Sequence, residues 1–329
     1  MLSPTSALVL LYTASLLLWQ IVGLTPLAGW WLIDLANVFH VWFYLPLPFL
    51  ALLVAWRREW QAGAWLLLPL LLLALDYGPL FLPRGGRGEG AALRVMTANL
   101  LWLNDDAEAV AQAMLDQAPD LIAVQELGGG IAGPLAQRLR ARYPYQALHP
   151  AWSTDGMGLF SRYPLRAQSM DDSPGACRCQ QATMDFGRRA VTLLNAHPAR
   201  FTIRPEQGSE GSLPFSLTYS EQQRTLADML EKTDELQEPG LLLGDLNLVD
   251  HQRPYRRLAH RLRDAHREVG WGLGYTFPAR RFYSLPLPPL IRIDYVFYDY
   301  AWTASSAWTV EIPGSDHRAV VADLVLKAP

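Results

Sequence analysis

Eight polar residues follow apolar runs at five places in the second part of the chain. They occur in the segments TANL, VQEL, NAHP and GDLN, and in RIDYVF together with SDHRAVV. Carboxylates can hold a hard cation or take a proton from water, whereas amides and imidazoles can donate hydrogen bonds to phosphate oxygens. These segments therefore supply the groups that phosphate-ester chemistry needs. The residues are Asn99, Glu126, His197, Asp245, Asn247, Asp294, Asp316 and His317.

The elements that must position these residues follow from the apolar pattern. The sequence predicts a strand, a helix and a second strand over Leu93–Leu101, Asp105–Gln117 and Leu121–Leu127. This pattern predicts an α/β or α+β four-layer sandwich, in which two packed, mostly antiparallel sheets are flanked by helices. Further strands are predicted near 158–161, 180–185, 190–195, 241–243, 292–298, 303–312 and 319–326, and further helices near 135–142, 219–236 and 255–263.

One such residue alone is weak evidence, because an acid after a strand more often caps a helix or closes a turn. The order of the whole set is specific. Strand-TxN, strand-QE, strand-NxH, strand-GDxN, strand-ID and SDH resemble the endonuclease/exonuclease/phosphatase superfamily, the fold of pancreatic deoxyribonuclease. LFSRYPL at Leu159–Leu165 agrees with this resemblance, which spans the whole polar part of the chain.

The resemblance implies a divalent cation, Mg²⁺ or Mn²⁺, held by oxygen ligands. Glu126 would be its main ligand, and Asn99 would support it from beside the site. Asp316 would lie close enough to ligate the cation directly or through water. One departure from the family pattern concerns the residues after Asn99. Leu100, Leu101 and Trp102 stand where nucleases of the family often have an acidic or amide residue, which puts an abasic-site type of nuclease in doubt.

The same resemblance assigns roles to the remaining residues. Asp245 would orient or deprotonate the attacking water, and Asn247 would donate its amide to the phosphate. His317 would donate to a non-bridging phosphate oxygen, while Asp294 fixes the imidazole tautomer and favours its protonated form. His197 would be a second imidazole that contacts the phosphate or acts as an acid.

The first part of the chain has a different composition. Residues 1–83 contain two arginines and three acids as their charged side chains, and three long uncharged runs cover Pro4–Leu24, Leu35–Trp56 and Trp60–Leu82. Runs of this length can cross a bilayer as helices. We therefore expect a membrane anchor of three helices over 1–83, with Pro46 and Pro48 kinking the second. A glycine-rich linker follows over 84–91, and the catalytic domain covers 92–329.

The sequence gives little indication of the side of the membrane on which the catalytic domain lies. Arg57 and Arg58 in one loop oppose three arginines after the last run, so the positive-inside rule is nearly balanced. The resemblance to membrane-anchored bacterial members favours an extracytoplasmic catalytic domain. Cys177 and Cys179 are interpreted as ordinary strand or loop residues, because one intervening residue is too short a spacing for an unstrained disulfide.

Charge bears on the substrate. The chain has 28 basic and 31 acidic residues, and the anchor holds two of the basic and three of the acidic ones. The rest of the chain therefore has a net charge of −2. A protein that tracks nucleic acid usually has a basic surface instead. Arg280 and Arg281, in an aromatic loop before Asp294, are candidate substrate contacts. The favoured hypothesis is a phosphodiesterase or phosphatase acting on lipid headgroups or other membrane-proximal phosphoesters. A membrane-tethered nuclease and an inactive binding module are the alternatives, and the sequence does not predict the oligomeric state.

Overall fold

The computed structural model describes residues 2–25, 27, 30–82, 84–86, 88–201, 203–205, 215–217, 219–279, 281–282 and 285–328. It divides into two compact units. A helical unit comprises residues 1–82 together with 251–253, and a second unit comprises 83–250 and 254–329. The helical unit is built from α1 (Pro4–Gly23), α2 (Trp31–Asn37), η2 (His40–Tyr44), α3 (Pro46–Arg57), α4 (Trp60–Tyr77) and η3 (Gly78–Phe81).

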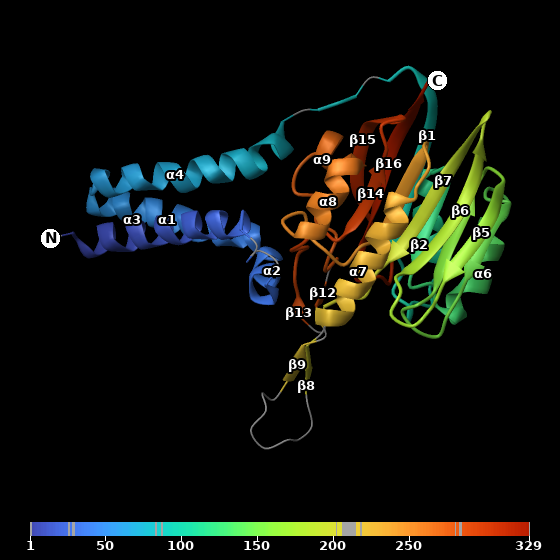
Figure 1. Ribbon diagram of the computed structural model, residues 1–329, viewed down its shortest axis with the longest axis horizontal. Helices are drawn as coiled ribbons and strands as arrows, with labels where there is room; N and C mark the ends of the chain where they lie inside the picture. The colour runs from blue at the N-terminus through green and yellow to red at the C-terminus, as the bar shows by residue number, and fades with distance from the viewer. Residues whose placement is uncertain are drawn as a thin grey trace. The chain divides into compact units, whose positions relative to one another are not determined.

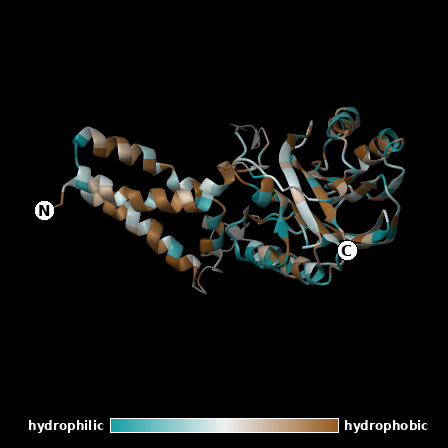
Figure 2. Ribbon diagram, turned by 90° about the horizontal axis from the view of Figure 1, so that it is seen from above, coloured by the Kyte–Doolittle hydropathy of each residue, from teal (hydrophilic) through white to brown (hydrophobic). Residues whose placement is uncertain are grey.

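Helices α1, α3 and α4 pack through a small apolar core that includes Val9, Val54 and Leu66. Many other large apolar side chains on these helices are exposed, among them Leu11, Leu52 and Leu67. Figure 2 shows the hydrophobic colour along most of the three helices. Helices that are apolar all round belong in a protein interior or in lipid. Three segments are long and apolar enough to cross a membrane, namely Pro4–Gly23, His40–Arg57 and Trp60–Phe81.

The second apolar run differs in detail from the prediction. Its first residues form the separate helix α2, and the long segment starts at His40 rather than at Leu35. Pro46 and Pro48 do not kink a helix interior but stand in the first turn of α3. Proline is favoured there because the first amide groups of a helix have no partner within it.

The first sheet of the second unit has the strand order β15-β16-β1-β2-β4-β3. Strands β1 and β2 run parallel, whereas the other neighbours are antiparallel. In the β1–β16 pair, Gly90 lies opposite Lys327, so the start of the unit pairs with its last strand. The strands are β1 (Gly90–Asn99), β2 (Leu121–Gln125), β3 (Tyr145–His149), β4 (Met157–Ser161), β15 (Trp302–Glu311) and β16 (Arg318–Lys327).

The second sheet has the order β11-β14-β10-β7-β6-β5, again with one parallel pair, β7 and β10, at its centre. Figure 1 shows β5, β6 and β7 side by side. Two such sheets confirm the predicted sandwich, each sheet being mixed but mostly antiparallel. The strands are β5 (Leu165–Asp171), β6 (Arg178–Phe186), β7 (Arg189–His197), β10 (Gly240–Asp245), β11 (Arg263–Asp264) and β14 (Asp294–Tyr298).

Three apolar clusters hold the layers together. Val95, Leu193 and Leu243 belong to the one between the sheets. Helices α5 (Ala107–Gln117) and α6 (Gly129–Leu139) pack on the first sheet, and α7 (Tyr219–Asp234) and α8 (Arg253–Arg261) pack on the second. The inventory of named elements also contains α9 (Ala265–Val269) and the small hairpins β8 (Ile203–Pro205) with β9 (Phe215–Leu217) and β12 (Arg281–Phe282) with β13 (Leu285–Pro286).

The interpretation of the two cysteines was wrong, because Cys177 and Cys179 form a disulfide. Cys177 stands just before β6 and Cys179 is the second residue of this strand, so the pairing joins the strand to the turn that leads into it. Here their Cα atoms are 5.3 Å apart, which lies within the range that disulfides span. Both side chains are buried against the layer of α7.

Candidate active site

The polar strand ends meet at one edge of the sandwich. Because β1 with β2 and β7 with β10 are parallel pairs, the carboxyl ends of these four strands project their following residues in the same direction. Asn99 Nδ2 donates to Glu126 Oε1 at 3.2 Å and to Asp245 Oδ2 at 3.0 Å. His197 Nε2 lies 3.5 Å from Asp245 Oδ2 and 3.9 Å from Glu126 Oε1. Four predicted site residues are thus in one cluster.

A buried amide network behind this cluster joins the two sheets. Gln125 Nε2 donates to Asn195 Oδ1 at 2.7 Å and to Thr97 Oγ1 at 3.1 Å. Asn195 Nδ2 in turn lies within hydrogen-bond distance of the Val124 and Gly158 carbonyl oxygens. Thr97, Gln125 and Asn195 lie within the motifs TANL, VQEL and NAHP, but no role was predicted for them. Their position beside Asn99, Glu126 and His197 in those motifs was the signal that could have found them.

The backbone at Glu126 is unusual. Its φ of 52° lies in the left-handed region, which non-glycine residues seldom adopt and which often marks a functional site. The conformation turns the carboxylate toward the cluster, where Oε2 accepts a hydrogen bond from the Trp102 amide at 3.3 Å. Trp102 belongs to the segment in which the family pattern is broken, so this segment contributes a backbone donor instead of a side chain.

His317 lies between two carboxylates. Its Nδ1 is 3.0 Å from Asp294 Oδ2, and its Nε2 is 3.8 Å from Asp245 Oδ2. Ser315 fixes this loop, since its hydroxyl accepts from the His317 amide at 3.0 Å and donates to the Asn99 carbonyl at 2.7 Å. The SDH segment is therefore tied to the end of β1, and His317 joins the same cluster.

Burial and charge have opposite effects on these imidazoles. Burial by itself lowers the pKa of His317, but the negative charges of Asp294 and Asp245 raise it to about 10. Burial likewise lowers the pKa of His197, and its contact with Asp245 outweighs this effect and raises the pKa. Burial raises the pKa of Asp245, whereas the two imidazoles bring it down to about 2. An ionised Asp245 therefore lies beside a protonated His317 near neutral pH, whereas burial raises the pKa of Asp294.

Other predicted site residues are placed differently from expectation or not described. The Asn247 side chain donates to the Pro198 carbonyl at 3.0 Å, so its amide nitrogen is bonded to the loop that follows His197. Asp316 is half-buried. Among the described residues, Asp245, Asp294 and His317 offer ligand atoms within 4.8 Å of one another, and Asp316 does not belong to this group. Arg280 lies outside the described residues. Arg281 starts β12, and its side chain is not described.

The donor set fits a hard divalent cation. Glu126 offers a carboxylate that keeps some exposure, at 11% of its side chain, and Asp245 brings a second carboxylate within reach of the same Asn99 amide nitrogen. Asn99 Oδ1 accepts from the Leu101 amide at 3.0 Å, so Asn99 supports the carboxylates from beside the site. Carboxylate and amide oxygens are the ligands that Mg²⁺ and Mn²⁺ prefer. Asp245, Asp294 and His317 also offer ligand atoms within 4.8 Å of one another. Because Asp294 Oδ2 is already paired with His317 Nδ1 at 3.0 Å, we interpret these two residues as an acid–imidazole pair.

The sandwich and this cluster define the class to which the protein belongs. Residues 96–317, more than half of the chain, match the endonuclease/exonuclease/phosphatase family. The chain belongs to this family, as its motif order indicated. Comparison with curated proteins gave no match.

Solved structures share the fold. An endonuclease/exonuclease/phosphatase from Beutenbergia cavernae DSM 12333 is 21% identical, with 72% of each chain covered and a TM-score of 0.54. One from Bacteroides vulgatus is 19% identical, with 72% of this chain and 100% of that chain covered and a TM-score of 0.55. D. rerio TDP2 complexed with a single-strand DNA product is 16% identical, with 71% and 99% covered and a TM-score of 0.55.

The His317–Asp294 pair yields a prediction about ionisation. Changing Asp294 to Asn removes the nearest negative charge, so the pKa of His317 should fall, by about 1–3 units for loss of a charge at this range. Nitrogen NMR of the histidine rings of EDTA-treated full-length protein measures this pKa. Asp172→Asn, at an exposed position, is the matched control. An unchanged His317 pKa in Asp294→Asn would contradict the assigned role of Asp294.

Proposed function

We propose that this protein is a membrane-anchored phosphoesterase that depends on Mg²⁺ or Mn²⁺ and hydrolyses a phosphodiester or phosphomonoester by attack of water. The observation that carries the proposal is the convergence of Glu126, Asp245, His197 and His317 from separate strands, with 3.5–3.9 Å between the ionisable atoms of the neighbours. Membership of a phosphoesterase-containing family supports it.

The proposed roles of the site residues follow from their charges. When bound, the cation held by Glu126, with Asn99 supporting the site from beside it, would polarise the phosphate and offset its negative charge. Asp245, an ionised and nearly fully buried carboxylate, would take a proton from the attacking water. His197 and His317 would donate to phosphate oxygens as charge develops, and Asp294 holds His317 in the donating tautomer.

The buried charges favour an enzyme over an inactive binding module. Asp245 and Asp294 are 1% and 0% exposed. Burying a carboxylate costs several kcal/mol unless partners offset it. A module that only anchors a partner gains nothing from such an arrangement, whereas a hydrolase needs a desolvated base beside positive donors.

Hydrolysis by detergent-solubilised full-length protein tests the enzyme proposal. With bis(p-nitrophenyl) phosphate as substrate, we expect turnover in Mg²⁺ or Mn²⁺ that EDTA abolishes. Asp245→Asn should lower kcat by about 10²–10⁴, the usual contribution of a positioned proton acceptor. Asp172→Asn should leave the rate unchanged. Full activity of Asp245→Asn, or activity in EDTA, would refute the proposed mechanism.

For the substrate we propose a lipid headgroup or another phosphoester at a membrane surface. Two loops that hold site residues also expose large apolar side chains. Leu103, 66% exposed, follows Asn99 in its loop, and Trp152, 79% exposed, precedes Thr154, whose carbonyl lies 3.2 Å from His197 Nδ1. Exposed apolar residues beside a site suit an amphiphilic substrate better than a polyanion. The net negative charge of the same part of the chain agrees.

The double variant Leu103→Ala with Trp152→Ala tests this substrate class. On phospholipid vesicles its activity should fall about tenfold or more, because burial of one large apolar side chain contributes about 1.5–3 kcal/mol. On bis(p-nitrophenyl) phosphate it should match the wild type. Tyr300→Ala is the control, since Tyr300 is 50% exposed and follows the opposite end of β14 from Asp294. Equal loss on both substrates, or preferred cleavage of plasmid DNA, would favour a nuclease or another phosphoesterase instead.

We also propose that the catalytic unit lies outside the cytoplasm. The Cys177–Cys179 disulfide supports this side, because disulfides persist in oxidising compartments and are rare in the cytosol. The two cysteines are the whole thiol content of the chain, so a maleimide-polyethylene glycol reagent reports on them alone.

Cells quenched with acid and labelled with this reagent test the location. The protein should shift on a gel only after reduction, whereas Cys177→Ser with Cys179→Ser should never shift. A shift without prior reduction would place the cysteines in a reducing compartment and overturn the assignment.

A further inference from the structure

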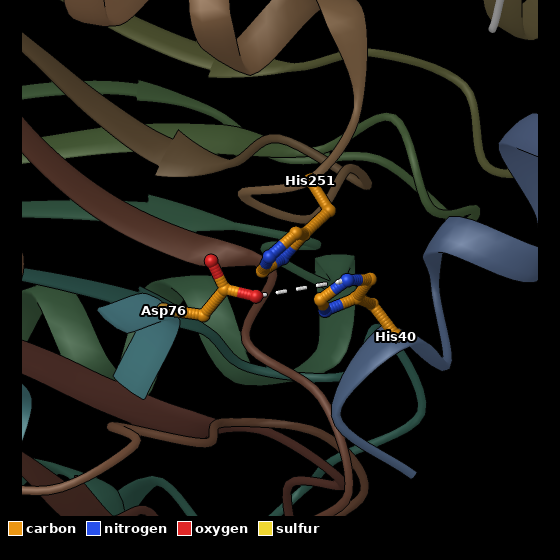
Figure 3. Close-up of side chains that lie close together, drawn as sticks. All are labelled: His40, Asp76 and His251. Atoms are coloured by element: carbon orange, nitrogen blue, oxygen red, sulfur yellow. Dashed lines mark ion pairs between the residues drawn. The ribbon is translucent and has the colours of Figure 1, made fainter. Parts of the chain in front are cut away.

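A second cluster of ligand-type side chains lies in the helical unit, apart from the residues of the candidate active site. It consists of His40, Asp76 and His251, each of which offers one ligand atom, and these atoms lie within 4.8 Å of one another. Figure 3 shows the three side chains pointing toward one another from separate segments. His40 begins the second membrane-span candidate and Asp76 lies near the end of the third.

The polar character of this place contrasts with the apolar helices that carry it. Asp76 is an acid within a leucine-rich helix, and His40 is buried, at 4% exposure. Ionisable residues at the ends of or within apolar spans are costly, and they are retained mostly where they have a function. The cluster therefore requires an explanation beyond packing.

Neighbouring side chains hold His40 and Asp76 by hydrogen bonds, as the ligands of a metal ion are commonly held. His40 Nδ1 lies 2.8 Å from the Tyr77 hydroxyl, and its Nε2 lies 3.4 Å from Gln20 Nε2 and 4.0 Å from Asp76 Oδ2. Asp76 Oδ2 accepts from the Tyr44 hydroxyl at 3.1 Å and from Gln20 Nε2 at 3.3 Å. Metal-binding histidines commonly use their second nitrogen in this way, and ligating carboxylates are commonly held by neighbouring donors.

The two imidazoles are also close. The rings of His40 and His251 stack with centroids 3.8 Å apart and planes inclined by 17°. Each imidazole has a ring nitrogen that can offer a lone pair to a metal ion, and the ligand atoms of both rings lie within 4.8 Å of each other and of Asp76. A shared cation converts this close approach of two imidazoles and one carboxylate from a cost into a gain.

We propose that His40, Asp76 and His251 form a second metal site, which binds a transition-metal dication such as Zn²⁺. Two imidazoles with one carboxylate suit Zn²⁺ better than Mg²⁺, which prefers oxygen ligands alone. Tetrahedral Zn²⁺ needs ligand atoms about 3.3 Å apart, given bonds of about 2.0–2.1 Å. The 4.0 Å between His40 Nε2 and Asp76 Oδ2 therefore closes with a small side-chain shift. Water would complete the coordination.

This site differs from the candidate active site in chemistry and in effect. His251 belongs to the segment 251–253, which follows β10 in the chain and packs within the helical unit. A bound ion would link this segment to η2 and α4 through His40 and Asp76. The role is structural, and it does not depend on whether the protein hydrolyses phosphoesters.

Zinc content tests the site in full-length protein purified in detergent. After EDTA treatment, the protein is loaded with Zn²⁺ in excess Mg²⁺, passed over a desalting column and analysed by mass spectrometry of the metal. Wild type should retain about one equivalent more Zn²⁺ than His40→Ala, His251→Ala or Asp76→Asn. His149→Ala, an exposed histidine, and Asp245→Asn should retain the wild-type amount.

A second measurement separates metal binding from folding. Co²⁺ loaded in place of Zn²⁺ should give visible d–d absorption in wild type and in Asp245→Asn, and none in His251→Ala that elutes as a monodisperse species on size-exclusion chromatography. Equal zinc content in wild type and folded His40→Ala and His251→Ala would overturn the proposal. Loss of zinc only in Asp245→Asn would assign the metal to the other cluster.

Discussion

The pairing of Gln125 with Asn195 is the constraint on which the site depends. These amides are fully buried in opposite sheets, and the 2.7 Å hydrogen bond between them joins β2 to β7 inside the sandwich. A buried amide left without its partner costs about 1–3 kcal/mol, so this contact selects one alignment of the two sheets. Glu126 follows Gln125 directly and His197 is two residues after Asn195, so the same alignment brings carboxylate and imidazole together.

Asp245 gives the site its electrostatic balance. It accepts from Asn99 and lies within 4 Å of both His197 and His317, with its side chain 2% exposed. Each buried charge in this group is tolerable because another of opposite sign is next to it. Neighbouring charges have also moved the pKa values of Asp245 and His317 apart, to about 2 and about 10.

Much of the sandwich and the identity of the strand-end residues followed from the sequence, because buried central strands are continuous apolar runs ended by polar residues. Edge strand β5 was missed because four of its seven residues are exposed and show no alternation. The turned amide of Asn247 and the Cys177–Cys179 bond depend on local backbone geometry that residue types do not encode. The approach of His251 to Asp76 was beyond prediction, since it joins segments far apart in the chain.

The pairing of β1 with β16 has a consequence for biosynthesis. Gly90 and Lys327 are opposite each other, so the middle of the first sheet is completed by the strand that is synthesised after all the other strands of that sheet. Such long-range pairing is slow, and earlier strands wait with unpaired edges. If the N-terminal helices enter a bilayer, they do so long before this step. The newly made chain would then be held at the bilayer while the polar cluster is still unassembled, and the proposed hydrolysis would be confined to molecules that have reached the membrane.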